Sequence, residues 1–175
     1  MKIFLIGYMG SGKSTIGREL SSQLNLPWID LDDEFELRYK ISITNFFHKY
    51  GEIAFRELEH KLLVDFFLVP DLVISTGGGT PCFLGNMELM NNNGITIYLS
   101  ATPEFLLSRI ESSTRKRPLF QLMNNGNISQ NIFTHLSSRE YYYNQSKIII
   151  DAQNPETKGI ITQILKYLET LPANK

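Results

Sequence analysis

The residues with the clearest chemical potential lie near the start of the chain, in the segment Gly7–Ser14, which reads GYMGSGKS. It fits the pattern G-x-x-x-x-G-K-[ST], in which glycines let backbone N–H groups curl around phosphate and the lysine reaches the β- and γ-phosphates. We call this segment the phosphate loop and predict that it binds a nucleoside triphosphate with Mg²⁺. The predicted phosphate contacts are Gly10, Ser11, Gly12, Lys13, Ser14 and Thr15. The alternative is a glycine-rich turn that binds nothing.

Two acids form the next group that can do chemistry. Asp30 and Asp32 follow a short apolar segment and are separated by one residue. Asp30 can hold the metal through water together with the Ser14 hydroxyl, and Asp32 can bond a substrate hydroxyl and accept its proton as a catalytic residue. The alternative is that carboxylates at these positions only stabilise the N-terminus of the helix that follows, and have no part in a site. We prefer that interpretation for Asp33 and Glu34.

Strand and helix patterns alternate along the chain and must position these residues. Short apolar runs typical of buried strands occur at 2–7, 27–30, 71–75, 95–99 and 148–150. Helical patterns occur at 13–23, 33–39, 42–50, 52–68, 83–90, 102–110, 129–145 and 155–171. The alternation predicts an α/β fold, a three-layer sandwich around a parallel five-stranded sheet. Ligands bind at the carboxyl ends of strands in such sheets, which is where the phosphate loop and both acids lie.

Composition excludes several classes of protein and names none. The 175 residues carry a formal net charge of -1, so no basic field favours nucleic acid. The single cysteine, Cys82, excludes an internal disulfide. No run approaches the roughly 18 to 20 apolar residues of a membrane span. We therefore expect one cytoplasmic domain over residues 1–175, without a nucleic-acid or membrane partner.

Further motifs follow in a characteristic order. They are Phe55-Arg56-x-x-Glu59, Gly77-Gly78-Gly79, Arg117-Pro118-Leu119 and Arg139. With the phosphate loop and the D-x-D pair at these spacings, the chain resembles the shikimate kinases from Lys2 to about Leu168. That family joins a nucleoside monophosphate kinase-like fold to transfer of the ATP γ-phosphoryl group onto the 3-hydroxyl of shikimate. The resemblance implies ATP and Mg²⁺ as cofactors, shikimate as the small-molecule partner, and a monomer.

The resemblance also implies a substrate site. Arg56 and Arg139 would bind the shikimate carboxylate, because guanidinium forks suit carboxylates. For Arg56 the alternative is an ion pair along its own helix with Glu52 or Glu59. The triple glycine, Gly77–Gly79, would let the backbone approach the substrate closely, or it is a plain turn. We expect a substrate-binding subdomain at about 31–60.

A lid is expected at about 112–127. By resemblance it folds over ATP and excludes water, and it carries Arg117 as a catalytic residue that stabilises the transferred phosphoryl group. The family holds adenine at positions that correspond to Arg109, Asn154 and Pro155.

Other functions remain open at this point. A gluconate or nucleotide kinase can have the same fold, and so can a regulatory domain that binds nucleotide without catalysis. Arg56, Arg139 and the triple glycine favour shikimate over gluconate or a nucleotide as the phosphoryl acceptor. Intact Lys13, Ser14, Asp32 and Arg117 argue against a domain that has lost catalysis.

Overall fold

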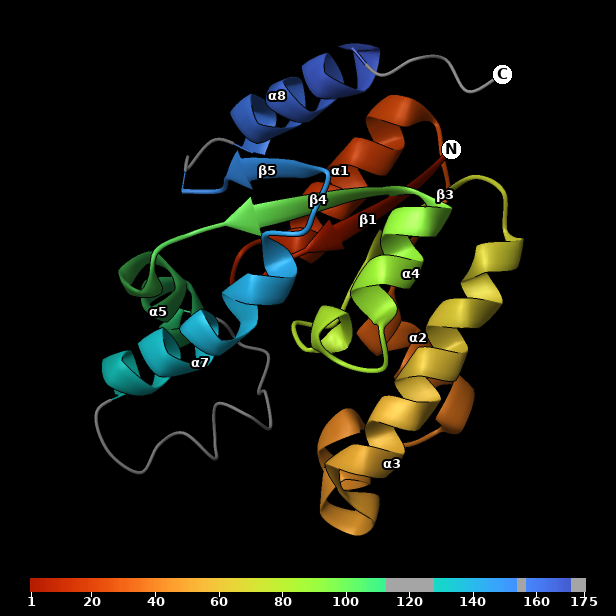
Figure 1. Ribbon diagram of the computed structural model, residues 1–175, viewed down its shortest axis with the longest axis vertical. Coiled ribbons are helices and arrows are strands. Elements are labelled where there is room, and N and C mark those ends of the chain that lie inside the picture. Colours follow the sequence, from red (N-terminus) through yellow and green to blue (C-terminus); the bar gives the residue numbers. More distant parts are fainter. Residues whose placement is uncertain (113–127, 154–156, 171–175) are drawn as a thin grey trace.

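The expected parallel sheet is present. The structure, a computed structural model, describes residues 1–112, 128–153 and 157–170. The strands are β1 Lys2–Ile6, β2 Trp28–Asp30, β3 Leu72–Ser75, β4 Ile95–Ser100 and β5 Ile148–Asp151. All neighbouring strands pair in parallel, in the order β2-β3-β1-β4-β5. Helices lie on both faces of the sheet, so the predicted three-layer α/β sandwich is confirmed (Figure 1).

Strand β1 explains why two separate cores form. It is buried along its whole length, and successive side chains point to opposite faces. Ile3 and Leu5 belong to one hydrophobic cluster. Phe4 and Ile6 belong to the other. The continuous apolar run at the start of the chain is thus the central strand of a sheet that is covered on both sides.

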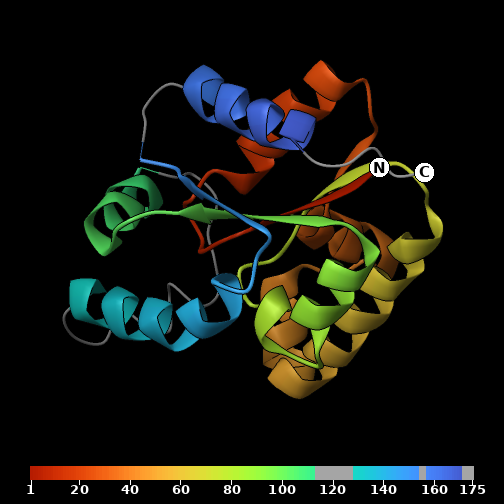
Figure 2. The same cartoon turned by 45° about the horizontal axis from the view of Figure 1, so that its top comes forward.

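The helices divide between these two cores. Figure 2 shows α1 and α8 side by side on one face, and their bounds are Lys13–Leu24 and Thr157–Thr170. The cluster on the opposite face takes residues from α2 Leu31–Tyr39, α3 Ile43–Asp65, α4 Asn86–Asn93, α5 Pro103–Glu111 and α7 Ile128–Tyr143. Two short 3-10 helices, η1 Phe66–Leu68 and η2 Thr80–Cys82, precede β3 and α4. Within the described ranges, no helix is long and apolar enough to cross a membrane.

Helix α3 is bent where two helices were predicted to meet. Gly51 interrupts it with φ 79° and ψ 175°, a backbone conformation that side chains other than glycine's rarely adopt. Its first part begins after Ser42, whose hydroxyl accepts a hydrogen bond from the Asn45 N–H at 3.3 Å. The second part carries Arg56. The boundary predicted between the helices at 42–50 and 52–68 therefore coincides with the non-helical backbone of Gly51.

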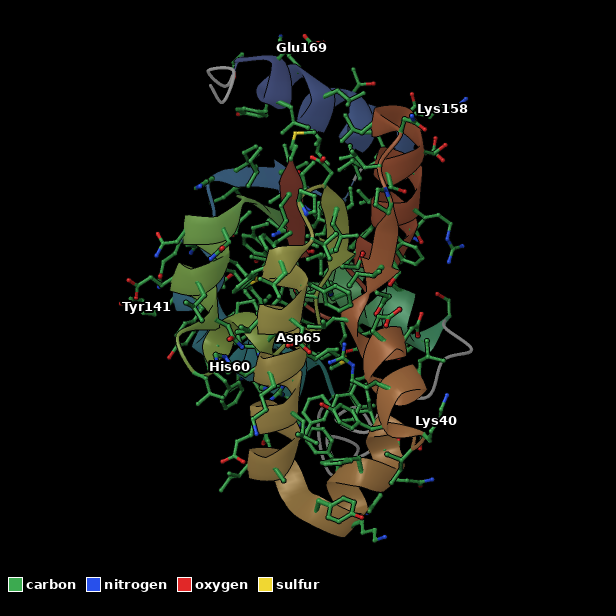
Figure 3. All side chains as sticks on the ribbon, turned by 90° about the vertical axis from the view of Figure 1, so that its right-hand side faces the viewer. Lys40, His60, Asp65, Tyr141, Lys158 and Glu169 are labelled. Carbon is green, nitrogen blue, oxygen red and sulfur yellow. The ribbon has the colours of Figure 1, made fainter. Side chains whose placement is uncertain are left out.

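An aromatic cluster fastens α2 to α3. The Phe35 ring packs edge-on against Phe46, with centroids 5.3 Å apart, and lies 4.7 Å from the Phe55 ring. Near the other end of α3, Asp65 forms an ion pair with Arg38 of α2, and Figure 3 shows Asp65 on the outward side of that helix. These contacts set the position of α3 and so of its Arg56 side chain.

The largest difference from the expected elements lies after the triple glycine. A helix was predicted at 83–90, but α4 begins at Asn86. Leu84 and Gly85 have φ values of 51° and 68°, which are not helical. The 3-10 helix η2, Thr80–Cys82, lies just before this turn. The apolar spacing indicated a helix here, whereas the left-handed turn that delays its start depends on backbone geometry that spacing does not report.

Candidate active site

The phosphate loop has the geometry of an anion-binding turn. Gly10 and Gly12 have φ values of 85° and 93°, a region that costs other residues energy. The loop leads into α1, whose N-terminus has no side-chain cap and no acid in its first turn. The first N–H groups of a helix lack partners within it, and with the helix dipole they favour a phosphate. The backbone thus supports the phosphate contacts predicted from the motif.

Lys13 is held inside this loop. Its side chain is buried, and its Nζ donates to the carbonyl oxygens of Gly7 at 2.8 Å and Tyr8 at 2.9 Å. Ser11 Oγ is buried nearby and has no hydrogen-bond partner among the described residues. Thr15 is exposed on the first turn of α1. The loop therefore holds an ammonium group and a hydroxyl close to the N-terminus of α1.

Ser14 and Asp30 meet at the end of β2. Ser14 Oγ donates to Asp30 Oδ2 at 2.5 Å, and the other oxygen of Asp30 accepts the Asp32 N–H at 3.1 Å. Asp30 is thus the N-cap of α2 as well as the partner of Ser14. Both interpretations of this acid, helix cap and metal-side ligand, agree with its position.

Asp32 and Glu59 converge on Gly77. A Cβ atom added to Gly77 would lie 2.9 Å from Asp32 Oδ1 and 2.8 Å from Glu59 Oε1. Glycine is therefore required here for space rather than for an unusual φ. The sequence predicted Asp32 at this end of the sheet, and the structure places its carboxylate beside the triple glycine.

Arg56 is buried in an ion-pair network. The side chain is 6% exposed, and its Nη1 donates to Glu59 Oε2 at 2.8 Å. Its Nε and Nη2 both donate to Glu52 Oε1, at 3.2 and 3.0 Å. Burial alone would lower the pKa of Arg56, but the charges and hydrogen bonds of Glu59 and Glu52 raise it above its usual value. The alternative helix pairing is therefore real; Arg56 and Glu59 pair in the interior beside the triple glycine, whereas Glu52 is exposed.

Arg139 is the second buried arginine, and its surroundings are different. It is also 6% exposed, but its Nη1 has no hydrogen-bond partner among the described residues, and no carboxylate there forms an ion pair with it. Its guanidinium lies 5.7 Å from the centre of the Tyr8 ring. Its Nη1 is 3.4 Å from the point where a Cβ of Gly78 would be. A buried guanidinium nitrogen without a hydrogen-bond partner is costly, so the Nη1 end of Arg139 suits an anion.

The triple glycine is fixed from two sides. Tyr143, one turn after Arg139 on α7, donates from its hydroxyl to the Gly78 carbonyl at 2.5 Å. Arg56 crowds the other end, since a Cβ on Gly79 would lie 2.7 Å from the guanidinium carbon. Together the three glycines place backbone directly against both arginines.

Gly79→Ala tests this close approach. Gly79 has φ -91°, so alanine costs no backbone strain and acts only by pressing on Arg56. We expect the free energy of unfolding to fall by about 1–3 kcal/mol and the KM of the acceptor to rise, with the KM of ATP unchanged. Gly85→Ala is the control, because its Cβ would meet nothing within 4 Å and its cost is purely conformational. Unchanged kinetics in Gly79→Ala would show that this contact has no role.

Tyr8 and His135 were not predicted to interact. Tyr8 Oη and His135 Nδ1 are hydrogen-bonded at 2.8 Å, and the rings meet edge-to-face with centroids 5.6 Å apart. Burial and the charge of Arg139 lower the pKa of His135 to about 4. The imidazole is therefore neutral at neutral pH.

This shift predicts a pH dependence of stability. Because the folded pKa of about 4 lies below the unfolded value of 6.5, the unfolded chain binds the extra proton first. We expect the contribution of His135 to be intact above pH 6.5 and to be lost as the pH falls towards 4. Urea unfolding of the wild type and of His135→Asn across this pH range separates the contribution of His135 from that of the carboxylates, which titrate in both proteins. Parallel curves for the two proteins would contradict the lowered pKa.

The remaining predicted residues are less defined. Arg109 is exposed on α5, stacks on Phe105 at 5.1 Å, and has its Cβ 3.5 Å from the point where a Cβ of Gly10 would lie. It therefore borders the phosphate loop. Arg117, Asn154, Pro155 and the expected lid beyond residue 112 lie outside the described residues.

Sequence reasoning assigned no role in the site to Glu59, Thr80, Tyr8 or His135. Glu59 is 2% exposed and accepts from Thr80 Oγ1 at 2.6 Å as well as from Arg56. Its helical spacing from Arg56 was the only local signal. His135 precedes Arg139 by one helical turn, but no pattern indicated that Tyr8 would meet it.

Comparison with known proteins places this geometry in a family. The family model described as shikimate kinase matches residues 9–169. The shikimate kinase of Azobacteroides pseudotrichonymphae is 44% identical over 165 residues, which cover 94% of this chain and 97% of that protein. The chain belongs to the shikimate kinase family. The resemblance inferred from the motifs is thereby confirmed over nearly the whole chain.

Solved structures of shikimate kinases have the same fold as this chain. The crystal structure of the enzyme from Bacteroides thetaiotaomicron has a TM-score of 0.90 and 35% identity, covering 97% of this chain and 98% of that one. The shikimate kinase from Acinetobacter baumannii, solved in complex with shikimate, has a TM-score of 0.90 and 29% identity, covering 99% of this chain and 95% of that one. The predicted fold is therefore that of solved shikimate kinases.

Proposed function

We propose that the chain is an ATP-dependent kinase that transfers the γ-phosphoryl group to the 3-hydroxyl of shikimate, giving shikimate 3-phosphate and ADP. The observation that carries this proposal is the buried Arg139 guanidinium, which has no carboxylate partner among the described residues and faces the triple glycine. We propose that a small acid binds there, with its carboxylate on Arg139 and Arg56. Membership of the shikimate kinase family and the relative solved with shikimate support the choice of acid.

The proposed reaction uses charge and positioning. Lys13 and the N–H groups of the phosphate loop hold the β- and γ-phosphates, and the arginines orient the acceptor. Asp32 bonds the reacting hydroxyl and takes its proton as the oxygen attacks the γ-phosphorus. The bond from that phosphorus to the β–γ bridging oxygen breaks, and ADP leaves. Arg117 is proposed to close over the transferred group.

The residues around Ser14 fit a magnesium ion. A hydroxyl and a carboxylate 2.5 Å apart at the phosphate loop are hard oxygen ligands of the kind that Mg²⁺ takes. Among the described residues, no three His, Cys, Asp or Glu side chains gather as a metal site, so we propose that Ser14 holds the ion directly and Asp30 through water. When bound with ATP, Mg²⁺ neutralises charge that develops on the phosphates.

The remaining assignments are proposals of the same kind. We propose that Arg109, Asn154 and Pro155 contact adenine, that residues 112–127 form a lid, and that 31–60 form the acceptor subdomain. Family resemblance supports a monomer that acts in the cytoplasm. Gel filtration with light scattering checks the monomer directly.

An ADP-release assay with a panel of acceptors tests the proposed function. Shikimate should give turnover, whereas gluconate and nucleoside monophosphates should not. Turnover with one of these and none with shikimate would replace the proposal by another kinase on this fold. Nucleotide binding without turnover of any acceptor would indicate a regulatory domain.

A further inference from the structure

The Tyr8–His135 hydrogen bond joins parts of the chain that are 127 residues apart. Tyr8 lies inside the phosphate loop, and its carbonyl accepts a hydrogen bond from Lys13. His135 lies on α7, one turn before Arg139. Residues four apart share a face of a helix, so the side chains of His135 and Arg139 can contact one neighbour together. That neighbour is the Tyr8 side chain, which is 1% exposed.

The Tyr8 side chain therefore touches α7 twice. Its hydroxyl bonds His135 at 2.8 Å, and its ring supports the Arg139 guanidinium at 5.7 Å. A ring face attracts a cation without neutralising it. The hydrogen bond fixes the ring because it removes rotation and tilt at the hydroxyl end.

The contrast with Arg56 explains why such a support matters. Arg56 is held by two carboxylates, Glu52 and Glu59, which accept three hydrogen bonds from its guanidinium and balance its charge. A third carboxylate beside Arg139 would compete with a substrate carboxylate for the same guanidinium. A phenol ring and a neutral imidazole orient Arg139 and leave its charge for the ligand.

The protonation states agree with this arrangement. Burial raises the pKa of Tyr8 to about 12, against a smaller opposing effect of Arg139. The pKa of His135 is lowered to about 4. Both side chains are therefore uncharged at neutral pH, so their hydrogen bond does not depend on an ion.

We propose that Tyr8 and His135 are positioning residues that orient Arg139 towards the acceptor carboxylate. The inference rests on the proposed function, since it assumes that Arg139 binds a carboxylate. Neither residue touches the reacting atoms. Their effect must therefore appear in acceptor binding rather than in the chemical step.

Steady-state kinetics of Tyr8→Phe, His135→Leu and the double variant test this. Tyr8→Phe removes one oxygen and keeps the ring under Arg139. We expect each single variant to raise the KM of shikimate about three- to tenfold, as for loss of one buried hydrogen bond, with kcat and the KM of ATP nearly unchanged. The double variant should be no worse than either single variant, because both remove the same bond. His135→Asn, whose amide oxygen reaches the position of Nδ1, should restore wild-type KM.

Shikimate methyl ester separates positioning from general damage. It lacks the carboxylate that Arg139 would bind, so the variants should lose much less activity with the ester than with shikimate. Tyr98→Phe is the matched control, since it also removes a hydroxyl from a buried tyrosine, one that interacts with Ser100 rather than with His135. It should change neither KM.

Three results would overturn the inference. These are additive effects in the double variant, equal losses with shikimate and its ester, or no rise in the shikimate KM of Tyr8→Phe. If His135→Leu does not fold, Tyr8→Phe and His135→Asn carry the same comparison. A wild type that turns over ATP with another acceptor but not shikimate would instead defeat the proposed function, so the two failures are distinguishable.

Discussion

Replacing Asp32 with asparagine is expected to lower kcat by about 10²- to 10⁴-fold, the range typical of a lost general base. The KM of ATP should stay close to that of the wild type. Asp32 lies on α2 with its Oδ1 beside Gly77, whereas the phosphate loop and Ser14, which we propose hold the nucleotide, lie between β1 and α1 and at the start of α1. The backbone N–H of residue 32, which donates to Asp30, is kept in the variant.

Asparagine matches aspartate in size, so this change isolates charge and proton acceptance. Single-turnover measurement of the phosphoryl-transfer step is the decisive readout, since product release can mask it in kcat. Asp33→Asn is the matched control, because it removes an adjacent carboxylate that is exposed on the same helix. A loss of less than about tenfold in Asp32→Asn, below that range, would show that Asp32 orients the hydroxyl without taking its proton.

The parts of the site that sequence could predict are those set by local pattern. The phosphate loop stands between a buried apolar run and a helix, so its glycines, Lys13 and Ser14 had one plausible arrangement. Asp30 and Asp32 follow the next strand, and parallel strands bring their carboxyl ends to one edge. Order and spacing of the later motifs then sufficed to identify the family.

The parts that sequence could not predict depend on contacts between distant segments. Arg56 and Arg139 looked alike as candidate carboxylate ligands. In the structure Glu52 and Glu59 of the same helix accept three hydrogen bonds from Arg56, whereas Arg139 Nη1, packed against Gly78 of a distant segment, is left without a partner among the described residues. The Tyr8–His135 bond is non-local, since it joins residues 127 positions apart. Such contacts follow from how the helices pack on the sheet, so they cannot be predicted from residue types and spacing along the chain.

The different surroundings of the two arginines lead to the second large effect. Arg56→Ala removes the partner of Glu59, which is 2% exposed. A buried carboxylate left uncompensated costs about 3–5 kcal/mol, so we expect this loss in the free energy of unfolding as well as weaker shikimate binding. Removing both charges in Arg56→Leu/Glu59→Leu should recover part of the stability, because no buried charge is then left alone. Urea denaturation measures both variants.

Arg139→Ala should behave in the opposite way. Among the described residues no carboxylate loses an ion-pair partner when Arg139 is removed, and relief of a buried cation offsets the lost packing. We expect stability close to that of the wild type, with shikimate binding weaker by about 2–5 kcal/mol, as for one truncated partner of a buried charge pair. Calorimetric titration with shikimate and with ADP checks this, and only the shikimate affinity should fall. If Arg139→Ala instead unfolds the protein as Arg56→Ala does, the guanidinium serves the fold, and the carboxylate must bind elsewhere.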